Sequence, residues 1–179
     1  MKKLIACIFM LFAGMSFTGC STVHVVSPNS IKLKSTDVHH IESIKWTIDK
    51  NAKIIPYKMV FAAGNETINQ FDVQIASEQL GIFYQTVGGI FVANVKNSTY
   101  SQKSEKRVKP AILHIEAVKA QYDLHEEVCD VTVIATLKNA NVVLWMEAFL
   151  MSTKCSDDVK SAKQLESTII GRISSDGLL

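Results

Sequence analysis

The residues that could carry chemistry in this chain are four cysteines and five histidines, some of which have carboxylates close by. Three places bring such groups together: His39 with His40, His114 with Glu116, and His125 with Glu126 and Glu127. The sequence has no serine flanked by glycines in a nucleophile elbow, no glycine-rich phosphate loop, and no two histidines at helical metal-ligand spacing. We therefore expect no enzyme active site, no metal site and no bound cofactor.

The first twenty residues hold the clearest functional signal. Lys2 and Lys3 are followed by an uninterrupted run of apolar and small residues over 4–17. This run has the length of a signal-peptide core and is shorter than the ~20 residues that span a bilayer. It predicts an export signal over 1–19, with an uncleaved membrane anchor as the alternative.

The run ends in Phe17-Thr18-Gly19-Cys20, and this tetrapeptide resembles the lipobox of bacterial lipoproteins. Gly19 and Cys20 match its small residue and its cysteine, whereas Phe17 and Thr18 stand where Leu and Ala or Ser are usual. The resemblance implies cleavage after Gly19, a diacylglycerol thioether on Cys20 and acylation of the new amino group. Each buried methylene contributes about 0.8 kcal/mol, so three acyl chains would anchor the protein almost permanently.

The residue after the lipid-bearing cysteine bears on location. In this family an Asp at that place usually retains a lipoprotein at the inner membrane, and here the residue is Ser21. The resemblance therefore implies attachment to the inner leaflet of the outer membrane, with the domain facing the periplasm.

The charge of the mature chain excludes one class of partner. The whole chain has 19 Lys and Arg against 17 Asp and Glu. Lys2 and Lys3 account for the excess, because the leader contains no acid, so the mature chain is neutral. A neutral exported domain has no long-range field that would attract nucleic acid. The expected partners are the membrane, through the acyl chains, and an envelope protein.

The use of cysteine follows from the same leader. Cys7 leaves with the signal and Cys20 carries lipid, so Cys129 and Cys155 remain as an even pair in an oxidising compartment. A bridge between them would stabilise the fold by roughly 3 to 4 kcal/mol on the chain-entropy model. Two buried free thiols are the alternative. A zinc site is disfavoured because no further His or Cys stands at ligand spacing.

The mature chain divides into a tether and one domain. Residues 20–40 are rich in Ser, Thr, Asn and Lys, with a short apolar alternation that includes Val23 and Val25. They predict a lipidated N-terminus and tether that contains at most one edge strand and spans roughly 25 Å as a flexible coil. Residues 41–179 contain no repeat, no low-complexity tract and no second apolar span, which predicts a single domain.

The first half of the domain is expected to be a hairpin, a helix and a short strand. Apolar residues alternate over 44–48 and recur over 53–62, on either side of the polar turn 49–51. Pro56 indicates that the second strand lies at a sheet edge or starts late. Residues 69–87 have helical periodicity, and Gly88 and Gly89 end the run before a strand over 90–95.

The helix over 69–87 has apolar residues on two sides. Phe71, Ile75 and Ile82 fall near the side opposite the expected core, where a helix lying on a sheet is normally polar. We interpret them as a surface for a partner helix or an acyl chain. The alternative is that the tether or a loop covers them.

The second half predicts an antiparallel meander and a closing helix. Strands are expected over 111–122, 131–137 and 142–151, and the last is apolar on both faces except at Glu147, which favours a central strand or a functional outer face. Ser156 as N-cap, with Asp157 and Asp158 in the first turn, begins an amphipathic helix that ends near Gly177. The predicted fold class is α+β, a largely antiparallel sheet with two amphipathic helices packed on it.

This order of elements on a lipid tether resembles small envelope lipoproteins, among them lipopolysaccharide-assembly lipoproteins and activators of peptidoglycan synthases. The resemblance covers element order alone, so no residue role is carried over. It implies a non-enzymatic accessory or binding protein of the cell envelope. Two alternatives are a lipid or small-ligand carrier with a cavity lined by 142–151, and a tethered hydrolase, for which the sequence offers no nucleophile and base.

Overall fold

The computed structural model describes residues 22–26, 31–32, 37–57, 67–102 and 108–179, so the expected signal peptide and Cys20 lie outside the described residues. The strands are β1 (Thr22–Val25), β2 (Ile31–Lys32), β3 (His39–Tyr57), β4 (Lys109–Asp123), β5 (Val128–Asn139) and β6 (Val142–Lys154). The helices are α2 (Gln70–Lys96) and α3 (Asp158–Ser175), with a short 3-10 turn, η1 (Thr99–Ser101), after α2.

The described strands form one mixed sheet in the order β1-β6-β5-β4-β3, with β2 also paired to β6. The pairs β1–β6, β2–β6, β4–β5 and β5–β6 are antiparallel, and β3–β4 is parallel. The parallel pair is joined by α2, because a chain needs a long crossover to return in the same direction. The predicted α+β class is confirmed, with a sheet that is mostly antiparallel.

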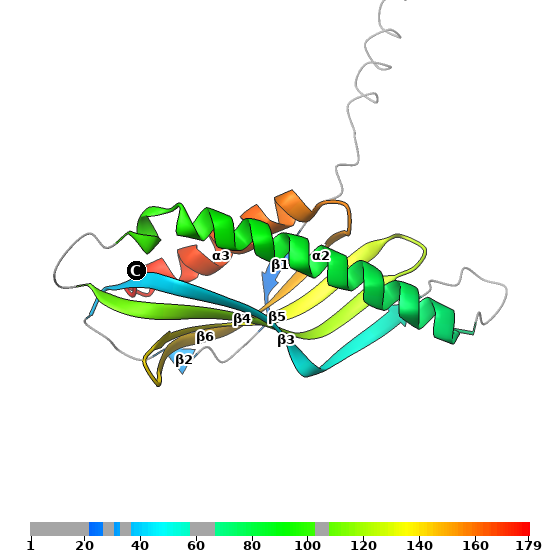
Figure 1. The fold of residues 1–179 in the computed structure, drawn as a ribbon, viewed down its shortest axis with the longest axis horizontal. Helices are drawn as coiled ribbons and strands as arrows, with labels where there is room; N and C mark the ends of the chain where they lie inside the picture. Colours follow the sequence, from blue (N-terminus) through cyan, green and yellow to red (C-terminus); the bar gives the residue numbers. More distant parts are fainter. Residues whose placement is uncertain (1–21, 27–30, 33–36, 58–66, 103–107) are drawn as a thin grey trace, which may run out of the picture.

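Both helices lie on the same face of the sheet (Figure 1). Buried and half-buried side chains alternate along the strands, and the buried ones pack against the helices in a single core. Its fully buried members include Leu113, Ile115, Val133, Trp145 and Phe149 from the strands and Phe83, Phe91, Leu165 and Ile169 from the helices. In the described part of the chain no helix covers the other face, whose side chains are mostly half-buried.

The predicted hairpin is wrong over the described residues 44–57, and the end of its second strand, 58–62, lies outside them. β3 continues through Asp49-Lys50-Asn51 as one strand, with a register shift that lies between the pairs Ile48–Ala117 and Lys53–Lys119. The backbone N–H of Asn51 donates to Asp49 Oδ1 at 2.9 Å. The turn-forming residues thus produce a bulge that bends the strand and do not reverse it. Pro56 lies in the edge strand, as predicted.

The first helix is longer than predicted. Its start is confirmed by a capping box, in which Asn69 and Asp72 exchange hydrogen bonds of 3.0 Å. The helix runs through Gly88 and Gly89 to Lys96, so the predicted strand over 90–95 is wrong. A glycine pair predicts the end of a helix, but Gly88 is needed for close packing of α2 on Trp46. A Cβ on residue 88 would lie 2.4 Å from Trp46 Nε1.

Much of the predicted tether belongs to the sheet. Its expected edge strand is present as β1, with Val23 packed against the core, but 31–32 also form a strand and the domain does not begin at residue 41. His39 and His40 open β3 and are 4% and 7% exposed. The polar composition of 20–40 did not predict that β1, β2 and the start of β3 belong to the sheet, because a strand at a sheet edge needs apolar residues on only one side.

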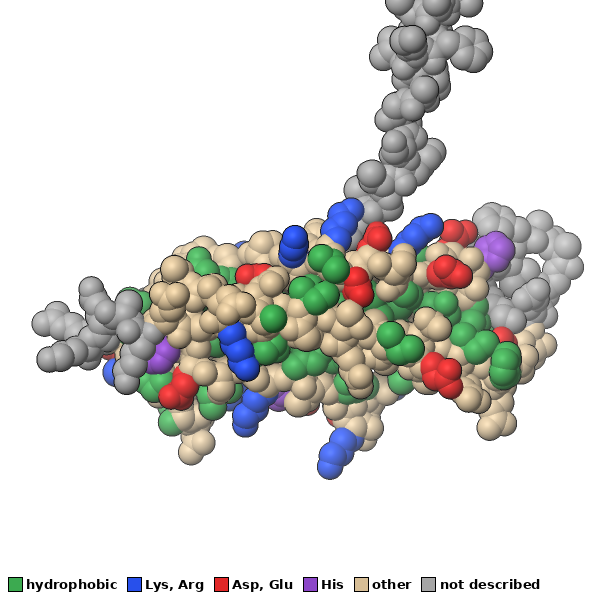
Figure 2. Space-filling model, turned by 45° about the horizontal axis from the view of Figure 1, so that its top comes forward, with side chains coloured by type: hydrophobic (Ala, Val, Ile, Leu, Met, Phe, Trp, Pro, Cys, Tyr) green, Lys and Arg blue, Asp and Glu red, His purple; other side chains and the backbone are tan. Residues whose placement is uncertain are grey.

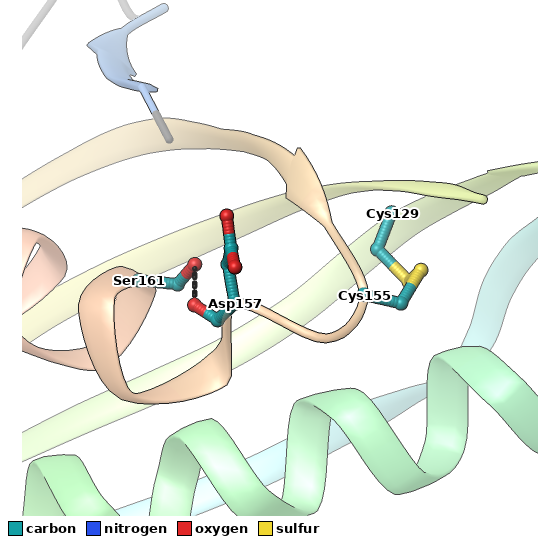
Figure 3. Close-up of a disulfide and its surroundings, with 4 residues drawn as sticks. All are labelled: Cys129, Cys155, Asp157 and Ser161. Atoms are coloured by element: carbon teal, nitrogen blue, oxygen red, sulfur yellow. Dashed lines mark hydrogen bonds between the residues drawn. A yellow bond between two sulfur atoms is a disulfide. The ribbon is translucent and has the colours of Figure 1, made fainter. Parts of the chain in front are cut away.

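The end of the chain mostly follows prediction. The disulfide between Cys129 and Cys155 is present, with 5.2 Å between the two Cα atoms, and it joins the start of β5 to the turn before α3 (Figure 3). The N-cap of α3 is Asp157 and not Ser156, whereas the end near Gly177 is confirmed by its φ of 75°. In the described ranges, neither helix is long and apolar enough to cross a membrane.

Candidate functional site

The predicted partner surface on α2 is only partly exposed. Phe71 and Ile82 are 67% and 62% exposed, whereas Ile75 is half-buried and packs against the core. Three helical turns separate Phe71 from Ile82, about 16 Å along the axis. The hydrophobic side chains in Figure 2 accordingly form separate spots between polar ones. Ile75 therefore does not belong to a free surface, and these three residues do not form a continuous stripe.

A more coherent apolar site lies between the β3 bulge and α2. It is a cleft of about 100 Å³ whose floor is formed by β4 and β5. We call it the β3 cleft, and it is lined by Ile48, Ala52, Ile54, Ser77, Leu80, Gly81, Tyr84, Ala117, Lys119, Ala120 and Val131. A hollow of this size has room for one apolar side chain, since ligand pockets for drug-sized molecules are about 300 to 1,000 Å³.

Two features of the chain keep the β3 cleft open. The bulge after Ile48 displaces β3 from β4, and Ile48 and Ile54 on its two sides are 49% and 40% exposed. On the opposite wall, Gly81 carries no side chain, and the position of an added Cβ would have no atom within 4 Å. The cleft is therefore an opening in the packing of α2 against the sheet.

The wall beside Gly81 is held in place by Tyr84. Its hydroxyl donates to the backbone oxygen of Thr47 at 3.0 Å, and its ring stacks on Trp46 with 4.6 Å between ring centroids. Burial raises the pKa of this phenol above its usual range, so it remains neutral and keeps its donor proton. Tyr84 thus joins α2 to β3 next to the cleft.

One basic residue, Lys119, lies at the boundary of the β3 cleft. Lys53 and Lys119 are exposed register partners on β3 and β4, and Lys50 lies exposed in the bulge. Like charges directly opposite one another destabilise a sheet. An anionic group placed between Lys53 and Lys119 would relieve that repulsion.

The histidine-carboxylate pair that the sequence singled out lies elsewhere, on the uncovered face of the sheet. His114 Nε2 and Thr47 Oγ1 are 2.8 Å apart, and Glu116 is the register partner of Thr47. Desolvation lowers the pKa of His114, against the opposing effect of Glu116. A hydroxyl and an imidazole in contact on an open face do not by themselves make a catalytic site, which also requires a bound substrate and charge stabilisation.

The described residues bear on the expectation about metal but not on the one about lipid. Among the described residues, no group of three or more His, Cys, Asp or Glu side chains could hold a metal ion. Cys20, the expected lipid attachment, lies outside the described residues. Sequence reasoning missed the β3 cleft because its two walls are distant in the chain. The polar residues 49–51, which interrupt the apolar alternation of β3, are the sequence signal for the bulge beside the cleft, but locally they predict a turn.

Comparison with known proteins yields little. No family model matches the chain, and no curated protein matches it. Two solved structures of PelC dodecamers from Paraburkholderia phytofirmans, one of them a point variant, are similar to this chain at 12% identity. The alignments cover 82% of this chain and 95% and 96% of those chains, with TM-scores of 0.31 and 0.30.

Proposed function

We propose that this chain is a lipid-anchored accessory protein of the bacterial cell envelope that binds a partner protein and catalyses no reaction. The observation that carries the proposal is the β3 cleft, which lies at the edge of the sheet opposite the strand nearest Cys20. The lipobox-like sequence ending at Cys20 supports the anchor, and Ser21 after it supports the location at the outer membrane.

The strand nearest the proposed anchor, β1, lies at the edge of the sheet opposite β3. Only Ser21 separates Cys20 from Thr22, the first residue of β1, so the two Cα atoms are at most about 8 Å apart. An acylated Cys20 therefore holds the β1 edge close to the headgroups. Four inter-strand spacings of about 4.8 Å separate β1 from β3, or about 19 Å. The β3 edge then points away from the point of attachment.

The chemistry of the β3 cleft selects the occupant. A single apolar side chain inserted next to Leu80 would lose most of its contact with water, as in the central pockets that dominate protein interfaces. Lys119 at the boundary of the cleft favours a carboxylate beside that side chain. The proposed partner is therefore a protein segment that presents an apolar side chain next to acidic residues.

The lipid-carrier alternative has less support. The cleft is about 100 Å³, below the size of pockets that enclose a whole ligand. The helix-facing side of β6 is filled by core side chains, with Trp145, Phe149 and Met151 at most 1% exposed. The expected cavity along 142–151 would have to displace this packing, so a carrier function is the weaker candidate.

Two glycines provide a matched test of the docking site. Gly81→Leu places a side chain in the β3 cleft, whereas Gly89→Leu makes the same change on the same helix at a place with equally open surroundings. Both changes remove a helix-destabilising glycine, worth about 1 kcal/mol. A photo-crosslinker at Ile54 in cells should trap a protein partner in the parent chain and in Gly89→Leu, and should lose it in Gly81→Leu. Equal yields in both variants would contradict the proposed docking site.

The anchor is tested separately. Cys20→Ser should abolish acyl labelling and leave the precursor uncleaved, because no thiol is left to receive the diacylglycerol. Continued acyl labelling of this variant would overturn the proposed attachment. The same variant, kept from the outer membrane by its uncleaved signal, should lose the Ile54 crosslink if the partner is confined to the outer membrane.

A further inference from the structure

A second hollow lies on the face of the sheet that the helices leave uncovered. Its volume is about 180 Å³, and it is lined by Lys119, Gln121, Asp130, Thr132 and Leu150. Register places these side chains in two neighbouring rows: Lys119 beside Thr132 and Leu150, and Gln121 beside Asp130. Directly opposed Cβ atoms in such rows are about 5 Å apart, so the five groups converge on one small volume.

The Asp130 carboxylate is the unusual member of this group. Its Oδ1 is buried and has no hydrogen-bond partner. A buried acceptor without a partner costs free energy, and more so when it is charged. Among the described ion pairs none joins Asp130 to Lys119, although they lie in adjacent rows. The site thus has one anion and one cation that do not satisfy each other.

We infer that this hollow binds a small zwitterionic ligand of the amino-acid type, with its ammonium group on Asp130 and its carboxylate on Lys119. The Gln121 amide and the Thr132 hydroxyl supply neutral hydrogen bonds, and Leu150 provides a short apolar contact for the ligand's carbon atoms. The opposite charges of the two ionised groups favour a ligand that carries both signs and no net charge. Lys119 also borders the β3 cleft on the helix-facing side of the sheet, whereas Gln121, Asp130, Thr132 and Leu150 line this hollow alone.

The test is a titration of the full-length chain in detergent with alanine, followed by the backbone amide NMR signals of 119–121, 130–132 and 150. Alanine should shift these signals in a saturable manner. Acetate and ethylammonium, each of which carries half of the charge pattern, should bind at least about tenfold more weakly, because each lacks one charge-assisted hydrogen bond. Absence of saturable shifts with alanine would overturn the inference, as would equal binding of either fragment.

Variants assign the effect to the named residues. Asp130→Asn keeps the shape of the side chain and removes its charge, so alanine binding should fall by about tenfold or more. Lys119→Gln should have a similar effect, and it provides the test should Asp130→Asn fail to fold. Lys138→Gln removes a lysine from the far end of the same sheet face, and Gly81→Leu fills the β3 cleft, so both should bind alanine as the parent does. Unchanged binding by Lys119→Gln or by folded Asp130→Asn would place the alanine elsewhere and refute the site.

Discussion

Gly88 of α2 packs closely against Trp46 of β3. A Cβ at residue 88 would lie 2.4 Å from Trp46 Nε1 and 2.5 Å from Cε2, well inside van der Waals contact. The indole cannot easily retreat, because it stacks on Tyr84 at 4.6 Å and lies against Phe91 at 5.5 Å between ring centroids. This contact explains why a glycine pair lies inside a continuous helix.

Gly88→Ala should therefore destabilise the protein by about 1 to 3 kcal/mol, the usual effect of overpacking. The adjacent Gly89 is exposed, and an added Cβ there would meet no atom within 4 Å. Gly89→Ala should stabilise by up to about 1 kcal/mol through helix propensity. Urea unfolding of both variants gives the comparison, and equal shifts in the same direction would contradict the packing role of Gly88.

His39 gives the fold a dependence on pH. Desolvation lowers its pKa, while Asp37 and the backbone at Leu178 act in the opposite direction. The unfolded chain then binds a proton below about pH 6.5 that the folded chain does not, so stability falls as pH falls through this range. The lowered pKa of His114 acts with the same sign.

Urea unfolding at about pH 7.5 and about pH 5.5 should show the lower stability at the acidic value. His39→Gln removes one titrating group, and this difference should shrink even if the variant is less stable at both values. Adding His114→Gln should shrink it further. A difference that is unchanged in the double variant would show that other groups set the pH dependence.

The candidate site shows what single residues could and could not reveal. The exposure of Phe71 and Ile82 was predictable, because helical periodicity places both opposite the core. The half-buried state of Ile75 was not, since the neighbour that covers one side of a helix is not encoded in that helix. The β3 cleft requires Ile48 and Gly81 to meet across a crossover, which local patterns do not specify.

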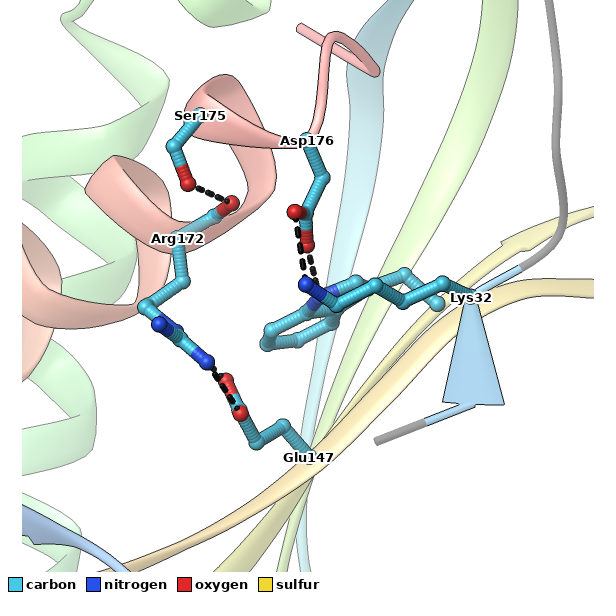
Figure 4. A network of polar contacts seen from close by, with 6 residues as sticks. Lys32, Glu147, Arg172, Ser175 and Asp176 are labelled. Atoms are coloured by element: carbon cyan, nitrogen blue, oxygen red, sulfur yellow. Dashed lines mark hydrogen bonds and ion pairs between the residues drawn. The ribbon is translucent and has the colours of Figure 1, made fainter. Parts of the chain in front are cut away.

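At the scale of elements, polar contacts fix α3 on β6. Glu147 points from β6 to the helices with its side chain 1% exposed, and Arg172 of α3 donates to both of its oxygens at 3.0 and 2.7 Å (Figure 4). Asp176, just after the helix, accepts from Lys32 of β2 at 2.8 Å and from Trp145 Nε1 at 3.0 Å. The end of α3 is thereby joined to β2 and β6 together.

Arg172→Ala should cost about 2 to 4 kcal/mol, because it leaves the buried Glu147 carboxylate without its cation. Lys163→Ala on the exposed side of α3 is the control and should change stability by less than about 0.5 kcal/mol. The double variant Glu147→Leu with Arg172→Met should recover most of the loss, because similar-sized apolar groups can replace a buried pair. Failure of the double variant to recover would indicate a specific need for the charges.

The elements themselves were predicted unevenly. Strands β4, β5 and β6 and helix α3 have local signals, namely apolar runs of strand length, a polar turn at 138–141 and acids in the first helical turn, and the structure contains all four elements. The predictions for β3 and for the part of α2 after Val87 were wrong, because Asp49-Lys50-Asn51 normally forms a turn and Gly88-Gly89 normally ends a helix, and tertiary packing overrides both preferences. The parallel pairing of β3 with β4 was not predicted either. It requires one long strand before α2 and one long helix that crosses over to β4, and both were divided in the prediction.

At the scale of the whole molecule, the early entry of the chain into the sheet changes the proposed tether. With β1 starting at Thr22, the distance from Cys20 to folded structure is at most about 8 Å rather than the roughly 25 Å of a free coil. The proposed attachment then also orients the molecule, because β1 is at one edge of the sheet and β3 at the other.

This orientation predicts which side chains meet lipid. A photo-crosslinker at the exposed His24 of β1 should form adducts with phospholipid in cells, whereas one at Ile54 of β3 should form few, because the two edges are about 19 Å apart. A flexible insertion of about twenty residues between Ser21 and Thr22, which spans roughly 25 Å, should abolish the His24 adducts while acyl labelling persists. Equal lipid labelling from His24 and Ile54 in the parent chain, or adducts that survive the insertion, would show that the short link between Cys20 and β1 does not orient the domain.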